Sequence, residues 1–218
     1  MNTFFKRYIS QFNARRFGLL ALIIGVSAIF LPFKASAATP AETLEACVKK
    51  LSGAKSMKAS FTATFNGRNV SGTLLTKGKK FSMTMPGLGT WYDGKSIWSY
   101  SSANGETTVW TPTAAELAES NPLLYLSSAS DYNVKAGTGA KKGESVIVLT
   151  PKKRNSGVKS VTAVINNATS LPKRLTIVAG SASSTVTLTS LTLNATIADS
   201  QFAYPKSKYP KATVTDLR

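Results

Sequence analysis

The sequence predicts a mostly β protein with a few helices, built from antiparallel strands that follow one another along the chain. Three observations indicate this class. Residues 57–65 alternate strictly between apolar and polar side chains, the two-residue period of a strand with one buried face. Asp93-Gly94 separates two apolar alternations, which is a strong hairpin signal. A threonine three residues before a glutamate, at Thr39 and again at Thr113, marks the start of a helix.

The first expected helix begins at Pro40 and stops at Gly53. Thr39 caps it, Pro40 suits the first helical position, and Glu42 completes a capping box with Thr39. Glycine is the usual residue just past a helix end. The apolar residues that share one face at helical spacing are Ala41, Leu44, Val48 and Leu51. This amphipathic helix is therefore expected to lie on an apolar surface.

Strands joined by short polar turns account for most of the remaining chain. The expected strands are residues 57–65, 70–76, 81–85, 91–92, 96–100, 106–111, 132–136, 144–150, 160–166, 173–178, 185–193 and 212–217. A break is expected at Pro86-Gly87-Leu88-Gly89. Within 185–193, strict alternation puts one set of side chains on a single face: Val186, Leu188, Ser190 and Thr192.

Two short helices are expected to interrupt the strands after residue 111. Thr113 and Glu116 make the second capping box, and Pro122 suits the first position of the next helix. Leucines at 123, 124 and 126 make this helix more apolar than an exposed helix tolerates. The two helices either pack permanently on the core or lie over the mouth of the sheet, where they would be among the more mobile elements.

The first 37 residues have the pattern of a secretory signal peptide. A basic start is followed by an uncharged apolar run at 17–31, which is short for a membrane span, and by the small residues Ala35 and Ala37. We expect cleavage before Ala38, leaving one domain at 38–218. A retained membrane anchor is the alternative.

The chain is strongly basic, with 27 Lys and Arg against 10 Asp and Glu. A basic surface suggests anionic partners such as membrane headgroups, nucleic acid or an acidic protein, and export argues against nucleic acid. The lysines are dispersed, mostly at turns, so a solvated surface explains most of them. The single cysteine, Cys47, excludes an internal disulfide and is expected to be a small buried apolar group.

The sequence lacks the residues that most catalytic sites need. It has no histidine, which removes Ser-His-Asp and Cys-His catalysis and most zinc sites. It has no glycine-rich phosphate loop that enters a helix, and its few acidic residues are scattered. We therefore expect a protein that is not an enzyme and that has no metal or cofactor.

Residues 81–100 hold two of the three tryptophans and two of the four methionines. Methionine is a flexible side chain that is frequent on surfaces that accept varied apolar partners. The segment is interpreted either as the wall of an adaptable apolar cavity or as an ordinary sheet core.

Four short segments resemble the LolA family, the periplasmic carriers of outer-membrane lipoproteins, and most of all its divergent Bacteroidetes-type members. They are the strand pair at 72–83, with Gly72, Leu74 and Phe81; the run from Trp91 to Tyr100, with Asp93-Gly94, Ile97 and Trp98; Asn121-Pro122-Leu123; and the tail from Phe202 to Arg218, with Tyr209 and Asp216. The resemblance spans residues 38–218.

The resemblance implies an unclosed antiparallel half-barrel covered by a helical lid, with a cavity that takes the acyl chains of a lipoprotein. It implies a periplasmic, monomeric carrier without cofactor. The implied partners are acylated lipoproteins, an inner-membrane lipoprotein-releasing transporter, and an outer-membrane acceptor or membrane surface.

The residues expected at the site follow from the apolar pattern and the resemblance together. The cavity-lining residues are Phe61, Phe65, Leu74, Phe81, Met83, Met85, Trp91, Trp98 and Tyr100. The lid residues are Leu44, Leu117, Leu123, Leu124 and Leu126. The sequence leaves open which of Trp91 and Tyr92 faces the cavity and which faces away from it, because both are aromatic.

Lys77 is the candidate for a gate. Well-studied members of the family carry Arg-Pro at the turn after the second strand, and that arginine helps to control opening. Here the turn is Thr76-Lys77-Gly78-Lys79. Lysine cannot make the planar fork of hydrogen bonds that arginine makes, so a gate here would be weaker or built differently.

Two other functions are possible on the same pattern. The half-barrel also occurs in sensor or lipid-binding modules that act through a partner protein, which usually carry a second domain or an anchor. A structural or glycan-binding β protein would instead present exposed aromatic residues on a flat face and take up no lipid.

Overall fold

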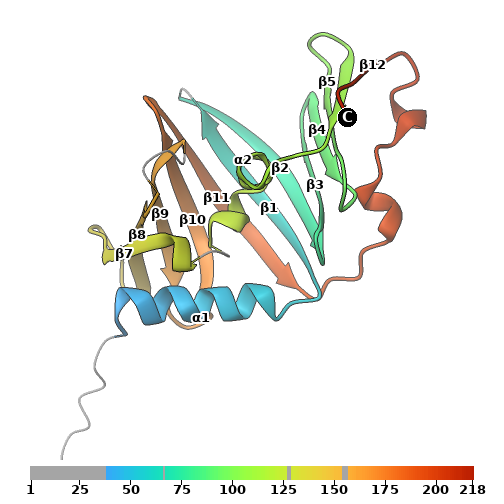
Figure 1. The fold of residues 1–218 in the computed structure, drawn as a ribbon. Helices are drawn as coiled ribbons and strands as arrows, with labels where there is room; N and C mark the ends of the chain where they lie inside the picture. The colour runs from blue at the N-terminus through green and yellow to red at the C-terminus, as the bar shows by residue number, and fades with distance from the viewer. Residues whose placement is uncertain (1–37, 66, 127–128, 154–156) are drawn as a thin grey trace, which may run out of the picture. The chain divides into compact units, whose positions relative to one another are not determined.

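The fold is that of a computed structural model, which describes residues 38–65, 67–126, 129–153 and 157–218 (Figure 1). The expected signal peptide, residues 1–37, lies outside the described residues. In chain order, with η for 3-10 helices, the elements are α1 (Pro40–Ser52), β1 (Ser56–Phe65), β2 (Arg68–Lys77), β3 (Lys80–Met85), β4 (Leu88–Tyr92), β5 (Ile97–Ser101), β6 (Glu106–Trp110), α2 (Ala114–Ser120), η1 (Pro122–Leu126), η2 (Ala129–Asp131), β7 (Tyr132–Ala136), β8 (Glu144–Pro151), β9 (Val158–Asn166), β10 (Leu171–Ala179), β11 (Ala182–Leu193), η3 (Asp199–Phe202), η4 (Lys206–Lys208) and β12 (Thr213–Asp216).

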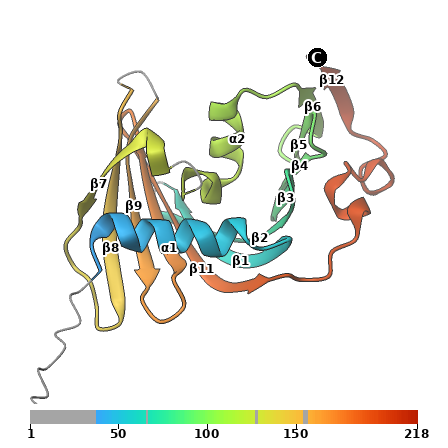
Figure 2. The ribbon, with the colours of Figure 1, turned by 60° about the horizontal axis from the view of Figure 1, so that its bottom comes forward.

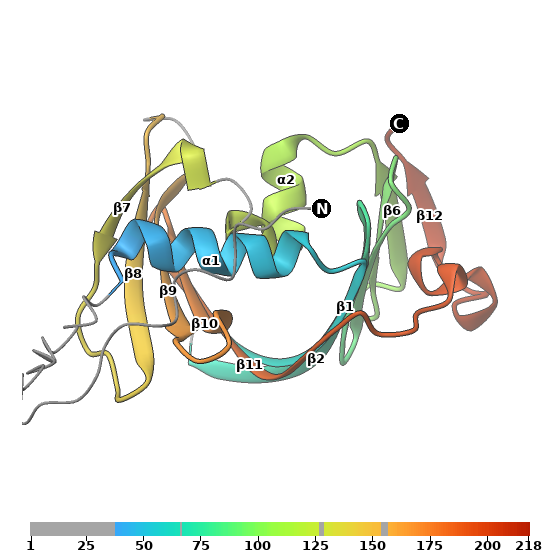
Figure 3. The same ribbon diagram turned by 90° about the horizontal axis from the view of Figure 1, so that it is seen from below.

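All of these strands belong to one 12-stranded sheet, in the order β12-β6-β5-β4-β3-β2-β1-β11-β10-β9-β8-β7. Neighbouring strands are antiparallel except for β12, which pairs parallel to β6. The sheet curves strongly around α1 and α2, and its two edge strands do not pair with each other (Figure 3). The predicted fold class, an unclosed antiparallel half-barrel with helices on its concave side, is confirmed.

Both predicted capping boxes form, and they fix where the helices begin. The Thr39 hydroxyl accepts a hydrogen bond from the Glu42 amide at 3.2 Å, and the Glu42 carboxylate accepts one from the Thr39 amide at 2.7 Å. Thr113 and Glu116 repeat the arrangement at α2. These bonds satisfy amides that have no partner inside the helix. Gly53 caps the end of α1, as predicted.

The predicted hairpin at Asp93-Gly94 joins β4 to β5. The Asp93 carboxylate accepts hydrogen bonds from the amides of Lys95 and Ser96, both at 2.8 Å. Gly94 has a φ of +103°, which other residues rarely adopt. One boundary differs from the prediction: β4 begins at Leu88, three residues earlier than expected, because Pro86 and Gly87 alone make the preceding turn.

A bulge in β11 corrects the predicted phase of that strand. Phe61 pairs with Leu188 and Ser60 with Ser190, so Thr189 has no partner on β1. The extra residue shifts the side-chain alternation by one position. Beyond the bulge, Leu191 rather than Ser190 shares the face of Leu188, and this face continues with Leu193.

One half of the concave face is filled. Helix α1 crosses β7, β8 and β10 and buries Leu44, Cys47 and Leu51 against them (Figure 3). The strand residues beneath it are fully or almost fully buried, and they include Ile147, Leu149, Val161, Ala163 and Leu175. The prediction that α1 lies on an apolar surface is thereby confirmed.

The C-terminal segment covers the opposite, convex side of β3–β6 (Figure 2). Phe202 is 1% exposed, and the ring of Tyr204 stacks on Trp98 with 5.2 Å between centroids. The chain then returns to the sheet edge as β12. None of the helices among the described residues has the length and hydrophobicity that a membrane crossing requires.

Candidate functional site

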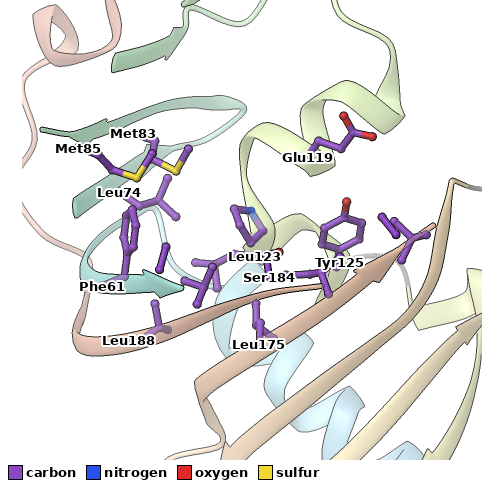
Figure 4. A pocket seen from close by; sticks show the side chains of 16 residues that line it. Phe61, Leu74, Met83, Met85, Glu119, Leu123, Tyr125, Leu175, Ser184 and Leu188 are labelled. Carbon is purple, nitrogen blue, oxygen red and sulfur yellow. The ribbon is translucent and has the colours of Figure 1, made fainter. Parts of the chain in front are cut away.

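An apolar cavity of about 240 Å³ lies on the concave face, under η1 and the end of α2 (Figure 4). Strands β1, β2 and β3 supply one wall through Phe61, Leu74, Met83 and Met85. Leu74 and Met83 are partners across β2 and β3, so their side chains lie next to each other.

A glycine makes room for the aromatic ring in this wall. Gly72 is the partner of Phe61 across β1 and β2. A Cβ atom at Gly72 would lie 2.5 Å from Cζ of Phe61 and 2.7 Å from Cγ of Met85. The ring therefore lies across the bare glycine backbone, which is one reason that glycine is found inside a strand.

The opposite wall comes from β10 and β11, and the cover comes from η1. The residues that β10 and β11 contribute are Leu175, Ile177, Ala179, Ser184, Val186 and Leu188. Leu123 and Tyr125 lie over the cavity (Figure 4), and Pro122 also lines it. Because most of the lining surface is apolar, the cavity suits a hydrocarbon chain.

The described polar side chains that line this cavity are those of Glu119, Tyr125 and Ser184. Glu119 projects from α2 with its carboxylate turned away from Leu123 and Tyr125 (Figure 4). Burial, with the charge of Glu119 and the nearby Tyr132, raises the pKa of Tyr125 to about 12. The phenol therefore stays neutral at physiological pH.

A second apolar pocket, of about 400 Å³, lies on the other side of Leu123, which among the described residues is the one that lines both. The last turn of α1 forms one side through Val48 and Leu51. Phe81 and Tyr92 form another, with ring centroids 5.5 Å apart. A further wall comes from Leu117 of α2 with Leu124 and Leu126 of η1, and the turn residues Gly78 and Lys79 also line the pocket.

The predicted cavity residues fall into three groups. Four of them, Phe61, Leu74, Met83 and Met85, line the first cavity, and Phe81 lines the second pocket. Phe65 lies at the end of β1, and its side chain is outside the described part of the structure.

Trp91, Trp98 and Tyr100 form the third group, and their predicted place in the cavity wall is wrong. Trp91 pairs with Trp98 across β4 and β5, on the face opposite to Tyr92. Their cover is the C-terminal segment: Tyr204 stacks on Trp98, and Tyr209 stacks on Tyr100 with 3.8 Å between centroids. The aromatic residues Tyr204 and Tyr209 in the C-terminal segment were the signal in the sequence that could have predicted this cover over the convex face.

The predicted lid residues also divide. Leu44 is 1% exposed in the filled half under α1 and lines neither pocket. Leu117, Leu124 and Leu126 line the second pocket, and Leu123 lines both. Whether these residues move to admit a ligand stays a prediction.

Lys77, the gate candidate, contacts the C-terminal segment. Its ammonium lies 3.0 Å from the Asp199 carboxylate and donates a hydrogen bond to the carbonyl of Ile197 at 3.3 Å. The Lys77 hydrogen bond and charge lower the pKa of Asp199. These contacts tie the end of β2 to the connection before η3, and a gating role stays a prediction.

Several lining residues escaped the sequence analysis, among them Leu175, Ile177, Val186 and Tyr125. The strands that carry Leu175, Ile177 and Val186 were expected, but the alternation alone does not say which face meets the cavity. Tyr125 lies on η1. Within the described ranges, no three His, Cys, Asp or Glu side chains come close enough together to hold a metal ion.

Comparisons with known proteins agree with the fold. The family described as outer membrane lipoprotein carrier protein LolA matches residues 52–205. No curated protein sequence matches the chain significantly.

Among solved structures, an uncharacterized conserved protein from Thermus thermophilus is 14% identical, with a TM-score of 0.55 over 80% of this chain and 97% of that one. A LolA superfamily protein from Nitrosomonas europaea is 12% identical, with a TM-score of 0.40 over 77% and 99%. The lipoprotein LppX from Mycobacterium tuberculosis is 17% identical, with a TM-score of 0.43 over 72% and 96%. At these identities the likeness concerns the fold alone.

Proposed function

Because the chain belongs to the LolA family of outer membrane lipoprotein carrier proteins, we propose that it is a periplasmic carrier that holds the acyl chains of lipoproteins in its concave cavity. The observation that carries the proposal is the apolar cavity under η1. In this proposal the protein is exported, loses residues 1–37, and acts as a monomer and without catalysis.

The physical need for such a carrier is large. Each methylene of an acyl chain costs about 0.8 kcal/mol when it is exposed to water, so a lipoprotein cannot cross an aqueous compartment free. The first cavity replaces that water with Phe61, Leu74, Leu175 and the two methionines. Methionine adapts its shape at little cost, which suits chains of varied length.

The cover over the cavity suits reversible loading. Helix η1 is a single five-residue 3-10 element, joined to α2 by Asn121. Displacing it would expose Leu123 and open the cavity without breaking any strand pair. In the proposal, a lipoprotein-releasing transporter of the inner membrane supplies the chain, and an acceptor or the outer membrane surface takes it by binding it more tightly.

Co-elution with a lipopeptide tests the proposal. The exported protein is mixed with a triacylated peptide and separated by gel filtration. We expect the peptide to elute with the protein. Elution of all the peptide apart from the protein would contradict the proposal, and capture of a partner protein without any lipid would favour a partner-binding module.

Met83→Glu sharpens the test, because it puts a charge into the apolar wall without compensation. We expect retention of the lipopeptide to fall at least about tenfold. Thr84→Glu is the matched control, since Thr84 is the next residue of β3 and is exposed on the convex face. Equal retention by the two variants would remove Met83 from the binding surface.

A further inference from the structure

We propose that one end of the sheet docks on a membrane surface with anionic headgroups, through a cluster of lysines. The α1–β1 connection, the β2–β3 turn and the β4–β5 turn lie at this end, where the chain also leaves β11 (Figure 1). These turns and the strand ends beside them form a lysine tip, which consists of Lys55, Lys58, Lys77, Lys79, Lys80 and Lys95. None of the six lines the first cavity, so the inference goes beyond lipoprotein carriage and would stand without it.

Direct contacts hold the turns of the lysine tip together. The Gly78 amide donates a hydrogen bond to the carbonyl of Lys55 at 3.4 Å, which joins the β2–β3 turn to the start of β1. Lys77 and Lys80 are partners across β2 and β3. A Cβ atom at Gly94 would lie 4.0 Å from Cγ of Lys80, so the β4–β5 turn borders the same group. The fold therefore gathers lysines that lie far apart in the sequence.

The acidic groups on these turns already have partners. The Asp199 carboxylate pairs with Lys77, whose hydrogen bond and charge lower its pKa, and the charge of Lys80 adds to this effect. The Asp93 carboxylate accepts hydrogen bonds from two amides of its own turn. Within the described ranges the other five lysines of the tip form no ion pair, and all but the half-buried Lys80 are exposed. The last turn of α1 adds two more lysines. Most of the positive charge therefore stays free for a partner.

The opposite ends of the same strands lack such a cluster. The β1–β2, β3–β4 and β5–β6 turns lie there. Among their described residues and the strand residues beside them, the basic group is Arg68 and the acidic group is Glu106. The positive charge along these strands is thus concentrated at one end, which would orient the molecule toward an anionic surface.

The composition of the lysine tip favours a membrane over a protein partner. Protein interfaces are depleted in lysine and enriched in arginine and aromatic residues. Every basic residue of the tip is lysine, and the large apolar side chains that are exposed in the described residues, Leu88, Val214 and Leu217, all lie outside these turns. Lysine is a point charge on a flexible stem, so it suits mobile headgroups that present no fixed pattern.

Sedimentation with lipid vesicles tests the docking. The exported protein is mixed with vesicles of phosphatidylcholine, with or without about a third of phosphatidylglycerol as the anionic lipid. We expect binding to the anionic vesicles alone, and loss of most of it when the salt rises from about 50 to about 500 mM. Equal binding to both kinds of vesicle would overturn the proposal. Capture by soluble polyglutamate and by no vesicle would overturn it in favour of an acidic protein partner.

A triple variant of the lysine tip locates the contact. Lys55→Gln, Lys79→Gln and Lys95→Gln together should weaken binding to the anionic vesicles at least about tenfold. The reason is that each lysine near an anionic surface contributes up to about fivefold. Binding within about twofold of that of the unchanged protein would place the contact elsewhere and overturn the proposal.

The matched control removes the same charge from the opposite ends of the strands, with Arg68→Gln, Lys153→Gln and Lys159→Gln. Because the ten residues of β1 span about 33 Å, these groups lie well beyond a Debye length of about 10 Å from a surface at the tip. Binding should therefore fall at most about twofold. Equal weakening in the two triple variants would mean that net charge alone attracts the protein, which would overturn the proposal.

Met83→Glu separates this docking from lipid carriage. It should bind the anionic vesicles as the unchanged protein does, whether or not it retains the lipopeptide. Loss of vesicle binding in Met83→Glu would mean that the cavity makes the contact with the vesicles, and docking through the lysine tip would be overturned. Far-UV circular dichroism checks that each variant is folded.

Discussion

The two halves of the concave face both bury apolar strand residues, but one half is filled and the other contains two pockets. Over β7–β10, the 13-residue helix α1 presents Leu44, Cys47 and Leu51 on one face, and the space beneath it is filled. Over β1–β3, β11 and the adjoining part of β10, the cover is the five-residue η1 between the ends of α1 and α2, and two pockets remain. The length and reach of the covering element therefore decide where the interior is solid and where it is hollow.

The strands contribute to this difference as well. In β1 the inward residues alternate large and small, with Ala59 and Ala63 on either side of Phe61. Gly72 faces Phe61 from β2 and adds no volume. Small side chains under a short cover leave space that no other described residue fills.

The largest expected effect comes from cutting a side chain out of the filled half. Leu149 is 0% exposed on β8, so Leu149→Ala should lower the free energy of unfolding by about 2–5 kcal/mol. Met83→Ala, in the wall of the hollow half, should cost at most about 1 kcal/mol, because its side chain already borders open space. Urea denaturation of both variants measures the difference. Equal losses would show that the two halves are packed alike.

Filling the hollow half is the converse change. Gly72→Ala puts a methyl group 2.5 Å from Phe61 and 2.7 Å from the carbonyl oxygen of Thr84, which belongs to the backbone and cannot turn away. We expect a loss of about 1–3 kcal/mol in urea denaturation, and weaker lipopeptide retention because the ring is pushed into the cavity. Ser71→Ala, on the exposed face next to it, is the control and should leave both unchanged.

At alkaline pH the two halves should lose stability in different pH ranges, because the pKa of the Cys47 thiol and that of the Tyr125 phenol are both raised by burial but start from different values. Burial raises the pKa of the Cys47 thiol from 9.0 to about 12. Its contribution to stability is complete below about pH 9 and is lost as the pH rises toward 12, because only the unfolded chain releases the proton in that window. At pH 10 the loss is about 1 kcal/mol.

Cys47→Ala should make the stability of the protein less dependent on pH between 9 and 10, measured by urea denaturation at several pH values. Tyr125 lines the first cavity, and its pKa is raised from 10.0 to about 12. Tyr125→Phe should therefore change the pH dependence of the stability only above pH 10. An unchanged pH dependence in Cys47→Ala would mean that the filled half admits water.

The smallest effect is expected at Lys77. Its ion pair with Asp199 is exposed, so Lys77→Gln should change stability by less than about 1 kcal/mol. Lipopeptide release from this variant is the informative measurement. Release at the rate of the unchanged protein would mean that Lys77 only ties β2 to the C-terminal segment, while faster release would support a gate.

Local chemistry made the elements predictable from the sequence. The capping boxes at Thr39 and Thr113, the Asp93-Gly94 turn and the alternation in β1 each depend on residues within a few positions of one another. Such signals act through hydrogen bonds and backbone geometry that need no distant partner. Together with the resemblance, they predicted nine residues in one cavity wall. The structure brings four of the nine together around the first cavity, namely Phe61, Leu74, Met83 and Met85.

What only the tertiary structure decided is which side of each strand faces the hollow. Alternation defines two faces but does not say which is inside, and one unpaired residue, Thr189, reverses the assignment for the rest of β11. Trp98 faces outward because Tyr204, more than a hundred positions later, covers it. The hollow itself depends on how far a short helix reaches across a curved sheet, which is a property of the assembled chain and of no single segment.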